Sequence, residues 1–517
     1  ASYMIKEEYP EDTKIGLLSE NSVYWPAVYF ASQLLGMTIV TLDTQMKPRD
    51  NIHYLRHSGA GILFTSSDVY ESMDLDLAKG LKIKETILLD SPSFNGASSL
   101  EEILEGVKPA NVRDLNIDKI GKDSTAALLY TSGTTGSPKG VVLTHANILH
   151  QAEMIPEIVT FTPEDVFYGV LPLFHTLPTV ASLIAPFISG ASVVFPKTIR
   201  ATTLVKIMKD RGVTVMVGVP ALYESLKKAM VNQISHSSIL VKSVFGTLKG
   251  ITKVLNVTGM NAGRVTFSAI RSKVGMKDVY MMISGGAPLM TETADFFNLL
   301  GIEFFEGYGL TETSPVLTVN YKGKKGSVGK AVINVDIRIS DPDENGIGMI
   351  EVRGPNIMKE YYRNTEATDE IFLGDGWLST GDLGYVDSDG YLFLKGRNKN
   401  VIVSSAGKNI YPEEVEDKVR RSNFILECMV YGRRESESNQ AQTVEALIYP
   451  DFETIDAHFR EEGIEETDEA IYALINEEVK RLTKNLPNYK KIRKFRIHRE
   501  DFEKTSTRKI KRFLYAD

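Results

Sequence analysis

The sequence predicts an α/β protein with a large N-terminal domain of parallel sheets flanked by helices, a small β subdomain and a smaller α+β C-terminal domain. Three observations support this prediction. Strand and helix patterns alternate from the start of the chain, short strands and turns take over after Val328, and a separate set of elements follows Asn400. The chain has 517 residues. That length suits about three to four structural units of roughly 150 residues each.

The composition is that of an ordinary globular protein and excludes several classes. Hydrophobic residues make up 43% and charged residues 24%, which excludes wholesale disorder, a collagen-like fibre and a disulfide scaffold. The net charge of −8 argues against a dedicated nucleic-acid-binding protein. The single cysteine, Cys428, cannot form an internal disulfide. Together with the lack of a secretory signal pattern at the N-terminus, this favours a cytoplasmic location.

The N-terminal part of the chain repeats a strand–helix–strand pattern. It begins with a strand at Lys14–Ser19, an amphipathic helix at Ser22–Leu35 and a strand at Met37–Leu42. Because parallel strands need crossover connections, usually helices, this pattern predicts a parallel sheet with helices on its faces. Further buried strands are predicted at Gly61–Thr65, Glu85–Asp90, Val141–Leu143, Ala191–Phe195, Thr214–Val219 and Val279–Ser284.

One segment tests the prediction of a globular protein. Val166–Pro196 has no Asp, Glu, Lys or Arg and is long enough to cross a bilayer. However, three prolines and Gly190 interrupt it, and it carries His175 and several hydroxyl side chains. These residues favour a buried strand, loop, helix and strand over a membrane span.

Turn residues delimit the β subdomain and the domain that follows it. Strands predicted at Val335–Ser340 and Gly348–Arg353 flank the turn Pro342–Gly346, and a second hairpin turns at Ser388–Gly390. We place the N-terminal domain at residues 1–397 and the C-terminal domain at residues 398–517. The C-terminal domain is predicted to contain strands at Val401–Ser404, Leu426–Tyr431 and Val444–Tyr449 and a helix beginning at Pro412.

The segment Tyr130–Gly140 is the first candidate binding site. After Tyr130 it contains only Gly, Ser, Thr, Pro and Lys, and it joins an apolar run to a predicted strand. Glycines let a backbone approach phosphate oxygens, N–H groups and hydroxyls can bind those oxygens, and Lys139 adds a positive charge. The spacing differs from that of a Walker A loop. A flexible surface hairpin is the alternative interpretation.

Two shorter motifs could hold other parts of a nucleotide. In Gly307–Thr313 the glycines allow a tight turn, Tyr308 offers a ring for stacking, and Glu312 could bind Mg²⁺ through its carboxylate. In Trp377–Asp382, the side chain of Asp382 could accept both hydroxyls of a ribose. A turn after a strand and an Asx turn are the respective alternatives.

Basic residues later in the chain admit functional and ordinary interpretations. Arg397 could reach a ribose or a phosphate, and the residues after it could act as a hinge near Lys399. Taken alone, the tail Lys504–Arg512 is typical of a flexible basic terminus. The sequence contains no G-x-S-x-G elbow, H-E-x-x-H helix or G-x-G-x-x-G loop, and Cys428 is predicted to be a core residue.

Taken together and in this order, the motifs resemble those of the adenylate-forming superfamily of acyl-CoA synthetases, peptide-synthetase adenylation domains and luciferases. The resemblance covers nearly the whole chain. Thr131–Gly140 resembles the phosphate loop, Ser284–Pro288 the adenine-pocket segment and Tyr308–Thr313 the adenine-stacking and magnesium motif. Gly407–Pro412 resembles the loop that enters the site for the second half-reaction. Before the tail lysine, this chain has Arg508 where the superfamily usually has glycine.

The resemblance implies ATP, Mg²⁺ and coenzyme A as ligands. It implies Mg²⁺ ligation by Glu312 and Thr131, and rotation of a mobile C-terminal domain about Lys399 between two half-reactions. The catalytic residues that it implies are Thr131, Lys139, His175, Glu312 and Lys509. The ligand-binding residues that it implies are Thr131, Ser132, Gly133, Thr134, Thr135, Gly136, Lys139, Gly285, Gly286, Ala287, Pro288, Glu306, Gly307, Tyr308, Gly309, Thr311, Asp382, Arg397, Lys399, Gly407, Lys408 and Lys509.

Several segments are similar to the long-chain fatty acyl branch of this superfamily. Leu171–His175 resembles a motif at the acyl-tunnel entrance, with His175 as a gate candidate, and Ser284–Leu289 and Gly307–Pro315 are similar to sequences of that branch. The predicted reaction is ATP-dependent activation of a medium- to long-chain fatty acid to acyl-AMP, followed by transfer to coenzyme A. One alternative is a fatty acid–acyl carrier protein ligase with the same acyl-AMP chemistry. The other is a nucleotide-binding interaction protein without catalysis.

A basic stretch suggests where a lipid surface could bind. Residues 225–277 contain nine Lys and Arg residues and no Asp or Glu, and apolar residues recur in it at helical spacing. A basic amphipathic surface suits anionic lipids, which predicts peripheral contact with the inner face of a membrane. An ordinary solvated pair of helices is the alternative. No nucleic-acid partner is predicted.

Overall fold

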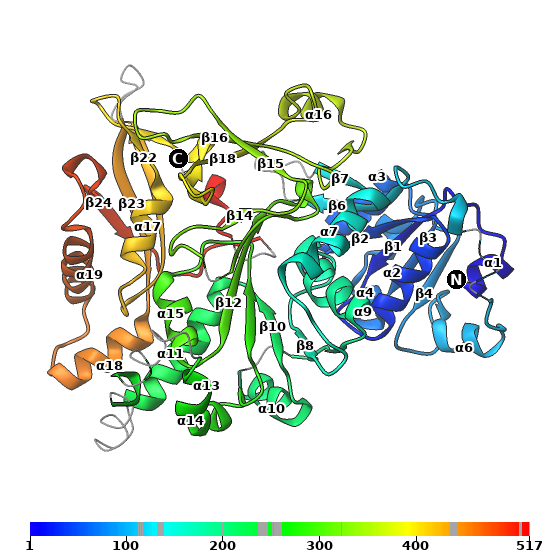
Figure 1. The fold of residues 1–517 in the computed structure, drawn as a ribbon, viewed down its shortest axis with the longest axis horizontal. Helices are drawn as coiled ribbons and strands as arrows, with labels where there is room; N and C mark the ends of the chain where they lie inside the picture. The colour runs from blue at the N-terminus through cyan, green and yellow to red at the C-terminus, as the bar shows by residue number, and fades with distance from the viewer. Residues whose placement is uncertain are drawn as a thin grey trace. The chain divides into compact units, whose positions relative to one another are not determined.

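The computed structural model describes residues 1–111, 113, 115, 117–131, 139–198, 201–235, 247–250, 252, 261–321, 323–434, 442–505 and 509–515 (Figure 1). The chain divides into two compact units. The first unit comprises Ala1–Asp336 and Val352–Leu378, and the second comprises Ile337–Glu351 and Ser379–Asp517. The boundary predicted between residues 397 and 398 separates a mobile C-terminal domain from the rest of the chain. The division into compact units does not test that mobility, so the boundary stays a prediction.

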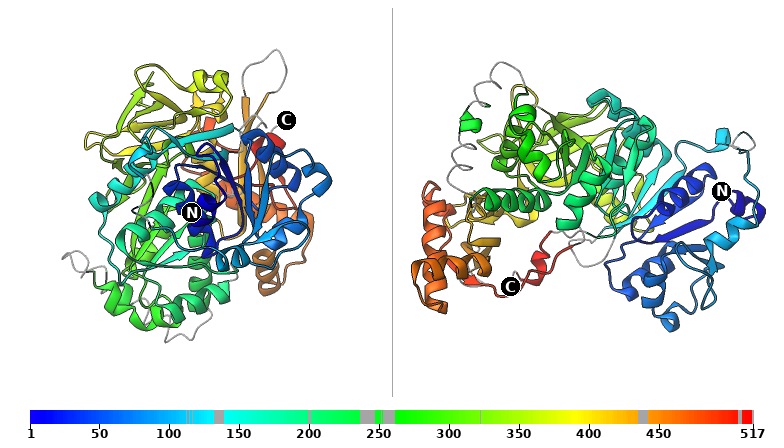
Figure 2. Two further views of the ribbon diagram at one scale, coloured as in Figure 1. Left: turned by 90° about the vertical axis from the view of Figure 1, so that its right-hand side faces the viewer. Right: turned by 90° about the horizontal axis from the view of Figure 1, so that it is seen from below.

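An eight-stranded sheet forms the N-terminal part of the first unit. Its central strands β2, β1, β3 and β4 are parallel, as predicted. Leu17 and Leu18 are both buried although neighbouring side chains of a strand point to opposite faces, so both faces are covered (Figure 1, Figure 2). The order is β17 (Glu360–Tyr361), β7 (Lys139–Thr144), β6 (Thr125–Thr131), β2 (Thr38–Thr41), β1 (Lys14–Leu18), β3 (Ile62–Thr65), β4 (Glu85–Leu88), β5 (Ser98–Ser99).

One predicted strand departs from the parallel arrangement of the central strands. The predicted strand Val141–Leu143 lies within β7, which runs antiparallel to β6, and β17 in turn runs antiparallel to β7. The physical reason is the short connection. Strands β6 and β7 are joined by residues 132–138 alone, too few for a helical crossover, so the chain must reverse.

A second, seven-stranded sheet completes the first unit. Strands β9, β8, β10, β11 and β12 are parallel, and β13 and β14 are antiparallel additions. Its core includes the buried residues Tyr168, Met216, Tyr223, Met282 and Phe297. The order is β14 (Lys330–Ala331), β13 (Val316–Tyr321), β12 (Glu303–Gly309), β11 (Met281–Ser284), β10 (Val215–Gly218), β8 (Val166–Gly169), β9 (Ser192–Val194).

The uncharged segment Val166–Pro196 forms the predicted strand, loop, helix and strand. It contains β8, then α8 (Thr176–Thr179), the π-helical η3 (Val180–Ile184) and α9 (Ala185–Ser189), and finally β9. Gly190 ends α9 in the left-handed conformation, with φ of 69°. Among the residues that the structure describes, no helix combines the length and the hydropathy needed to cross a bilayer.

The first unit also contains helices that cover the two sheets. For example, α3 packs Ile52 and Leu55 against Leu18 and Leu63 of the N-terminal sheet. The remaining bounds are α1 (Ser2–Lys6), α2 (Tyr24–Leu34), α3 (Pro48–Ser58), α4 (Ser67–Ser72), α5 (Leu75–Ala78), α6 (Leu100–Glu105), η2 (Ile117–Lys119), α7 (His145–Ile158), α10 (Ala201–Arg211), α11 (Pro220–Ser235), α13 (Gly263–Thr266), α14 (Ser268–Lys273), α15 (Thr291–Leu299), η4 (Thr311–Thr313) and α16 (Thr365–Ile371).

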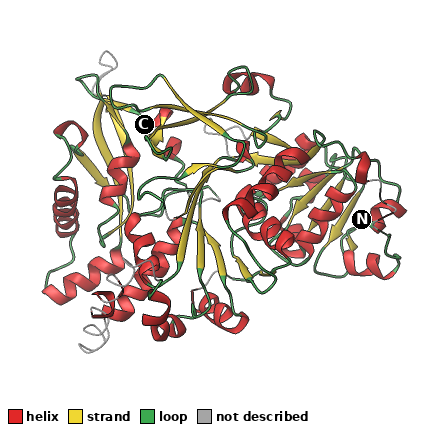
Figure 3. Ribbon diagram, in the orientation of Figure 1, coloured by secondary structure: helices red, strands yellow, loops and turns green. Residues whose placement is uncertain are grey.

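The second unit combines short strands and helices (Figure 3). A four-stranded sheet is formed by β15 (Asp336–Ser340), β16 (Gly348–Arg353), β18 (Leu378–Val386) and β19 (Leu392–Arg397), and β20 (Ile402–Val403) pairs with β21 (Asn409–Ile410). The third sheet contains β22 (Ile425–Arg434), β23 (Gln442–Pro450) and β24 (Lys494–Ile497). The helices are η5 (Asn398–Asn400), α17 (Pro412–Val419), α18 (Phe452–Glu462), α19 (Asp468–Thr483), η6 (Asn488–Lys490) and η7 (Arg512–Leu514).

The C-terminal tail is more ordered than its composition suggests. Lys504 and Ile510 form an antiparallel bridge, and the amide of Lys511 donates to the carbonyl of Glu503 at 2.9 Å. Arg512 then makes an ion pair with Glu416 of α17 at 2.5 Å. The interpretation of Lys504–Arg512 as a flexible terminus is therefore wrong for the described residues, because a buried carboxylate holds the end of this segment.

Candidate functional site

The two ends of the predicted phosphate loop lie side by side in the first unit. Thr131 of β6 is paired with Lys139 of β7, and the hydroxyl of Thr131 donates to the carbonyl of Lys139 at 3.4 Å. Ladder pairing on both strands therefore fixes the loop at its base. The predicted ligands between these ends lie outside the described residues: Ser132, Gly133, Thr134, Thr135 and Gly136.

The predicted magnesium residue lies close to this base. Glu312 lies in the 3₁₀ turn η4, and one of its carboxylate oxygens, Oε1, accepts a 2.8 Å hydrogen bond from the hydroxyl of Tyr361. The ammonium nitrogen of Lys139 lies 4.9 Å from the centre of the Tyr361 ring and 3.9 Å from a carboxylate oxygen of Glu370. Glu312 and Lys139 thus both contact the side chain of Tyr361.

This arrangement fits a magnesium ion that takes most of its ligands from elsewhere. Within the described part of the chain, no three His, Cys, Asp or Glu side chains form a metal-binding group. Mg²⁺ in nucleotide enzymes is usually held by one or two carboxylates together with phosphate oxygens and water. The half-buried carboxylate of Glu312 is chemically suitable for that role. The predicted ligation by Thr131 stays a prediction.

The ends of β11 and β12 bring the predicted adenine-pocket segment against the next motif. The amide of Leu289 donates to the Glu306 carboxylate at 3.3 Å, which ties the segment after β11 to β12. A Cβ atom on Gly285 would lie 3.3 Å from the carbonyl oxygen of Gly307, so the two backbones approach closely here. Tyr308 is 8% exposed. Nucleotide binding by these residues stays a prediction, and so does nucleotide binding by Gly286, Ala287, Pro288 and Thr311.

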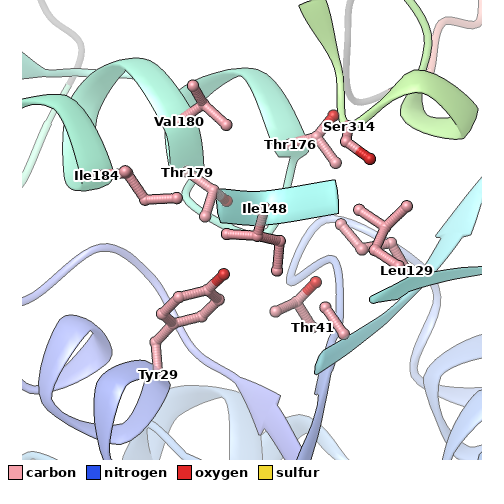
Figure 4. Close-up of a pocket in the computed structure, with 11 residues that line it drawn as sticks. Tyr29, Thr41, Leu129, Ile148, Thr176, Thr179, Val180, Ile184 and Ser314 are labelled. Atoms are coloured by element: carbon pink, nitrogen blue, oxygen red, sulfur yellow. The ribbon is translucent and has the colours of Figure 1, made fainter. Parts of the chain in front are cut away.

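An apolar pocket in the first unit is lined in part by Thr176, the residue that follows His175 in the sequence (Figure 4). The hydroxyl of Thr41 donates to the carbonyl of Phe174, and that of Thr179 donates to the carbonyl of Leu173. These threonines therefore satisfy their hydroxyls with backbone groups. The His175 ring packs against Phe174, with 4.4 Å between ring centroids. The lining residues are Tyr29, Thr41, Ala127, Leu129, Leu143, Ile148, Thr176, Thr179, Val180, Ile184 and Ser314.

In the second unit, the structure brings together the predicted ribose-binding residues. Asp382 and Arg397 are paired between β18 and β19, and the guanidinium Nε of Arg397 lies 2.7 Å from the carboxylate of Asp382. Gly381 precedes Asp382 with φ of 70°, a left-handed conformation that glycine adopts readily. The Asp382 side chain is buried, and its carboxylate oxygens are the kind of acceptor that can take hydrogen bonds from hydroxyl groups.

The other predicted residues of the second unit lie on turns and on the tail. Gly407 occupies an exposed turn between β20 and β21 with φ of 69°, and the Lys408 ammonium lies 5.1 Å from the centre of the Tyr489 ring. Lys509 is exposed, and its amide donates to the hydroxyl of Thr505 at 3.2 Å. Arg508 lies outside the described residues. Partial burial, together with Arg397 and Arg512, lowers the pKa of Lys399 to about 8.

Sequence reasoning missed two residues that contact the predicted site residues or anchor their segments. Tyr361 contacts Glu312 and Lys139, and Arg512 anchors the tail that carries Lys509. Arg512 was visible only as one of several basic residues. No local motif marks Tyr361, because its partners lie about 50 and more than 200 residues earlier in the chain. Only tertiary contacts identify it.

Comparison with known proteins identifies the family of this chain. The family model described as "AMP-binding enzyme" matches residues 1–362. The long-chain-fatty-acid–CoA ligase FadD15 of Mycobacterium bovis is 29% identical over 98% of this chain and 86% of its own length. The chloroplastic long-chain-fatty-acid–[acyl-carrier-protein] ligase AEE15 of Arabidopsis thaliana is 28% identical over 82% of this chain and 67% of its own.

The fold is also found in solved structures. The ATP-bound crystal structure of MatB from Rhodopseudomonas palustris superimposes with a TM-score of 0.75 and 25% sequence identity. The match covers 99% of this chain and 89% of MatB, so it includes both compact units. The α/β architecture with a small α+β C-terminal part is therefore confirmed. The chain belongs to the AMP-binding enzyme family, the adenylate-forming ligases that activate acyl groups.

Proposed function

We propose that this protein activates a fatty acid with ATP and transfers the acyl group to coenzyme A. The observation that supports the nucleotide half is the meeting of Glu312, Lys139 and Tyr361 at the base of the predicted phosphate loop. The choice of a fatty acid rests on the long-chain ligase of M. bovis, which aligns over nearly the whole chain, and on the apolar pocket that Thr176 helps to line.

The reaction has two balanced steps. A carboxylate oxygen of the acid forms a bond to the α-phosphorus of ATP, and the bond from this phosphorus to the pyrophosphate oxygen breaks. A thiol sulfur then forms a bond to the acyl carbon of acyl-AMP and loses its proton to water, the bond from this carbon to the phosphate oxygen breaks, and AMP leaves with that oxygen. Because the substrate supplies the nucleophile in each step, the protein contributes positioning and charge stabilisation.

Each predicted residue has a role that follows from its chemistry. Lys139 and the hydroxyl and glycine residues of the loop would hold the departing pyrophosphate. Asp382 and Arg397 would bind the ribose, and Lys509 would offset negative charge in the first step. Mg²⁺, when bound at Glu312, would neutralise part of the phosphate charge. His175 would line the entrance of the acyl site.

The test is pyrophosphate release with ATP and Mg²⁺ across acids from acetate to stearate, with and without coenzyme A. The proposal predicts a maximum at long chains and faster turnover when coenzyme A is present. A maximum at acetate or at aromatic acids would contradict the fatty acid assignment. No release with any acid in the series would contradict the proposed reaction itself.

The second candidate function is a fatty acid–acyl carrier protein ligase. The relative AEE15, which is named as such a ligase, favours this alternative because it matches over most of this chain. Coenzyme A and the carrier protein present the same phosphopantetheine thiol, so the core motifs suit both. Pyrophosphate release that ignores coenzyme A but accelerates with acyl carrier protein would support the alternative.

We propose that this protein is cytoplasmic and that residues 225–277 bind peripherally to the inner face of a membrane. The support is the charge pattern of that stretch. Much of it, residues 236–246, 251 and 253–260, lies outside the described residues. Flotation with phosphatidylglycerol-containing vesicles tests the contact, and binding that persists after deletion of residues 236–260 would contradict the role of this stretch.

A further inference from the structure

The segment from Met358 to Tyr362 connects two parts of the predicted nucleotide site. Its strand β17 pairs with β7, the strand that leaves the phosphate loop, and the amide of Tyr362 donates to the carbonyl of Gly140 at 2.7 Å. At its other end, the amide of Met358 donates to the carbonyl of Glu312 at 2.8 Å. One short edge segment therefore fixes the backbone of the Glu312 turn and of the strand after the loop.

Tyr361 extends this connection to the side chains. It is only 6% exposed, its hydroxyl donates to the Glu312 carboxylate, and the Lys139 ammonium lies 4.9 Å from the centre of its ring. A phenol can only donate to a carboxylate, so the hydrogen bond restricts the orientation of Glu312. A cation that lies within about 6 Å of an aromatic ring centre is attracted to that ring. A single side chain thus contacts both predicted catalytic charges.

The position of Tyr361 is itself fixed by the start of α16. Its amide donates to the hydroxyl of Thr368 at 3.0 Å, and its carbonyl accepts from the amide of Asn364 at 3.1 Å. The Asn364 side chain caps α16 by accepting from the amide of Ala367 at 3.0 Å. Because its backbone is held on both sides, Tyr361 can act as a rigid support for the two charged groups.

We propose that Tyr361 is a positioning residue: its hydroxyl orients Glu312 toward Mg²⁺, and its ring holds Lys139 at the phosphate end of the site. This inference rests on the proposed function for the roles of Glu312 and Lys139. Partners that orient a metal-binding carboxylate typically change metal affinity by roughly 10–100-fold when they are removed. The contact of the ring with Lys139 contributes less, about two- to five-fold in the affinity for the phosphate groups of the nucleotide.

Two substitutions separate the two contacts. Tyr361→Phe removes the hydroxyl and keeps the ring, whereas Tyr361→Leu removes both. We expect Tyr361→Phe to weaken binding of Mn²⁺ by about tenfold, measured by electron paramagnetic resonance in the presence of an ATP analogue with a methylene group between its α- and β-phosphorus atoms. Compared with Tyr361→Phe, we expect Tyr361→Leu to bind the ATP analogue about two- to five-fold more weakly, because the contact between the ring and Lys139 is also lost.

A neighbouring tyrosine provides the matched control. The hydroxyl of Tyr362 donates weakly to the carbonyl of Ser58 at 3.4 Å, whereas that of Tyr361 donates to Glu312. Tyr362→Phe removes the same atom one residue away, so its Mn²⁺ affinity should match that of the unmodified protein. A tenfold loss in this control would overturn the proposal, because it would show a general effect of this edge strand.

A double-mutant cycle distinguishes positioning from general destabilisation. In a Glu312→Gln background the metal carboxylate is gone, so adding Tyr361→Phe should no longer change the Mn²⁺ affinity. The same tenfold loss in both backgrounds would overturn the proposal, as would equal affinity of the unmodified protein and Tyr361→Phe. The binding measurement needs no turnover. Failure of the proposed reaction would appear only in pyrophosphate release, and the metal affinities would still decide the role of Tyr361.

Discussion

Gly309 illustrates how a single residue position depends on backbone packing. It ends β12, and the chain passes directly beside it on its way into β13. A Cβ atom at this position would lie 1.7 Å from the carbonyl oxygen of Pro315, which is far inside any real contact. Gly309 is therefore required by the close approach of two backbones next to the predicted magnesium turn.

This contact leads to a prediction for Gly309→Ala. We expect the substitution to lower the free energy of unfolding of the first unit by about 1–3 kcal/mol, because the backbone must move to admit the methyl group. Urea unfolding followed by circular dichroism measures the change. Gly106→Ala is the control, since φ there is −91° and the nearest atom to an added Cβ is 3.8 Å away. Equal stability of the two variants would contradict the argument.

Lys399 is the residue for which the structure predicts an effect of pH. Although it keeps contact with solvent, partial desolvation and the cationic Arg397 and Arg512 lower its pKa to about 8. The unfolded chain has the ordinary, higher pKa and so binds more protons between the two values. The contribution of this group to stability therefore rises as the pH increases above about 8.

The pKa of Lys399 can be measured by its reactivity. We expect acetylation of Lys399 by acetic anhydride, followed by mass spectrometry, to rise with a midpoint near pH 8. Arg397→Gln removes a cationic neighbour, so it should move the midpoint to higher pH. A midpoint near the ordinary value of lysine in the unmodified protein would contradict the assigned environment.

At the scale of elements, the tail is joined to α17 and β22 by one arginine. Both oxygens of Glu416 accept hydrogen bonds from Arg512, and the same guanidinium group donates to the carbonyl of Val430 at 2.8 Å. The amide of Val430 donates back to Glu416 at 2.7 Å. Burial raises the pKa of Glu416, and the positive charge of Arg512 opposes this effect.

Removing this arginine should destabilise the second unit. Arg512→Met leaves the Glu416 carboxylate buried without its partner, for which we expect a loss of about 3–5 kcal/mol in the free energy of unfolding. Arg460→Met is the control, because its ion pair with Asp456 is exposed to solvent and should contribute less than about 1 kcal/mol. Urea unfolding and hydrogen exchange at β22 measure the effect. A loss no larger than that of the control would show that the ion pair does not anchor the tail.

At the scale of the whole molecule, the proposed reaction requires Lys509 in the first half-reaction only. We expect Lys509→Ala to slow the formation of acyl-AMP by about 10²–10³-fold, the usual effect of losing one charge contact in a transition state. Thiolysis of supplied acyl-AMP should be largely preserved. Lys511→Ala is a matched control on the same tail, and stopped-flow assays of each half-reaction provide the measurement. Equal losses in both half-reactions would contradict the proposed division of labour.

Much of the fold could be predicted because burial leaves a periodic pattern in the sequence. The strands β1 to β4 and the helix α2 are predicted within a few residues, since short continuous apolar runs mark the buried strands and apolar residues at helical spacing mark the helix. The antiparallel direction of β7 was not predicted. The pattern of a strand shows that it is buried, whereas its direction depends on the length of the connection before it.

The sequence by itself determined the family, the two-part α/β architecture and the positions of the candidate motifs. These features depend on residue types that lie close together in the sequence, so they can be recognised without knowledge of the folded structure. The tertiary structure decided which of these motifs meet. In the folded chain, Glu312 and Lys139 both contact Tyr361, and the ion pair between Arg512 and Glu416 anchors the tail. Those contacts join residues separated by about 50 to more than 200 positions, and only the packing of strands and helices brings such residues together.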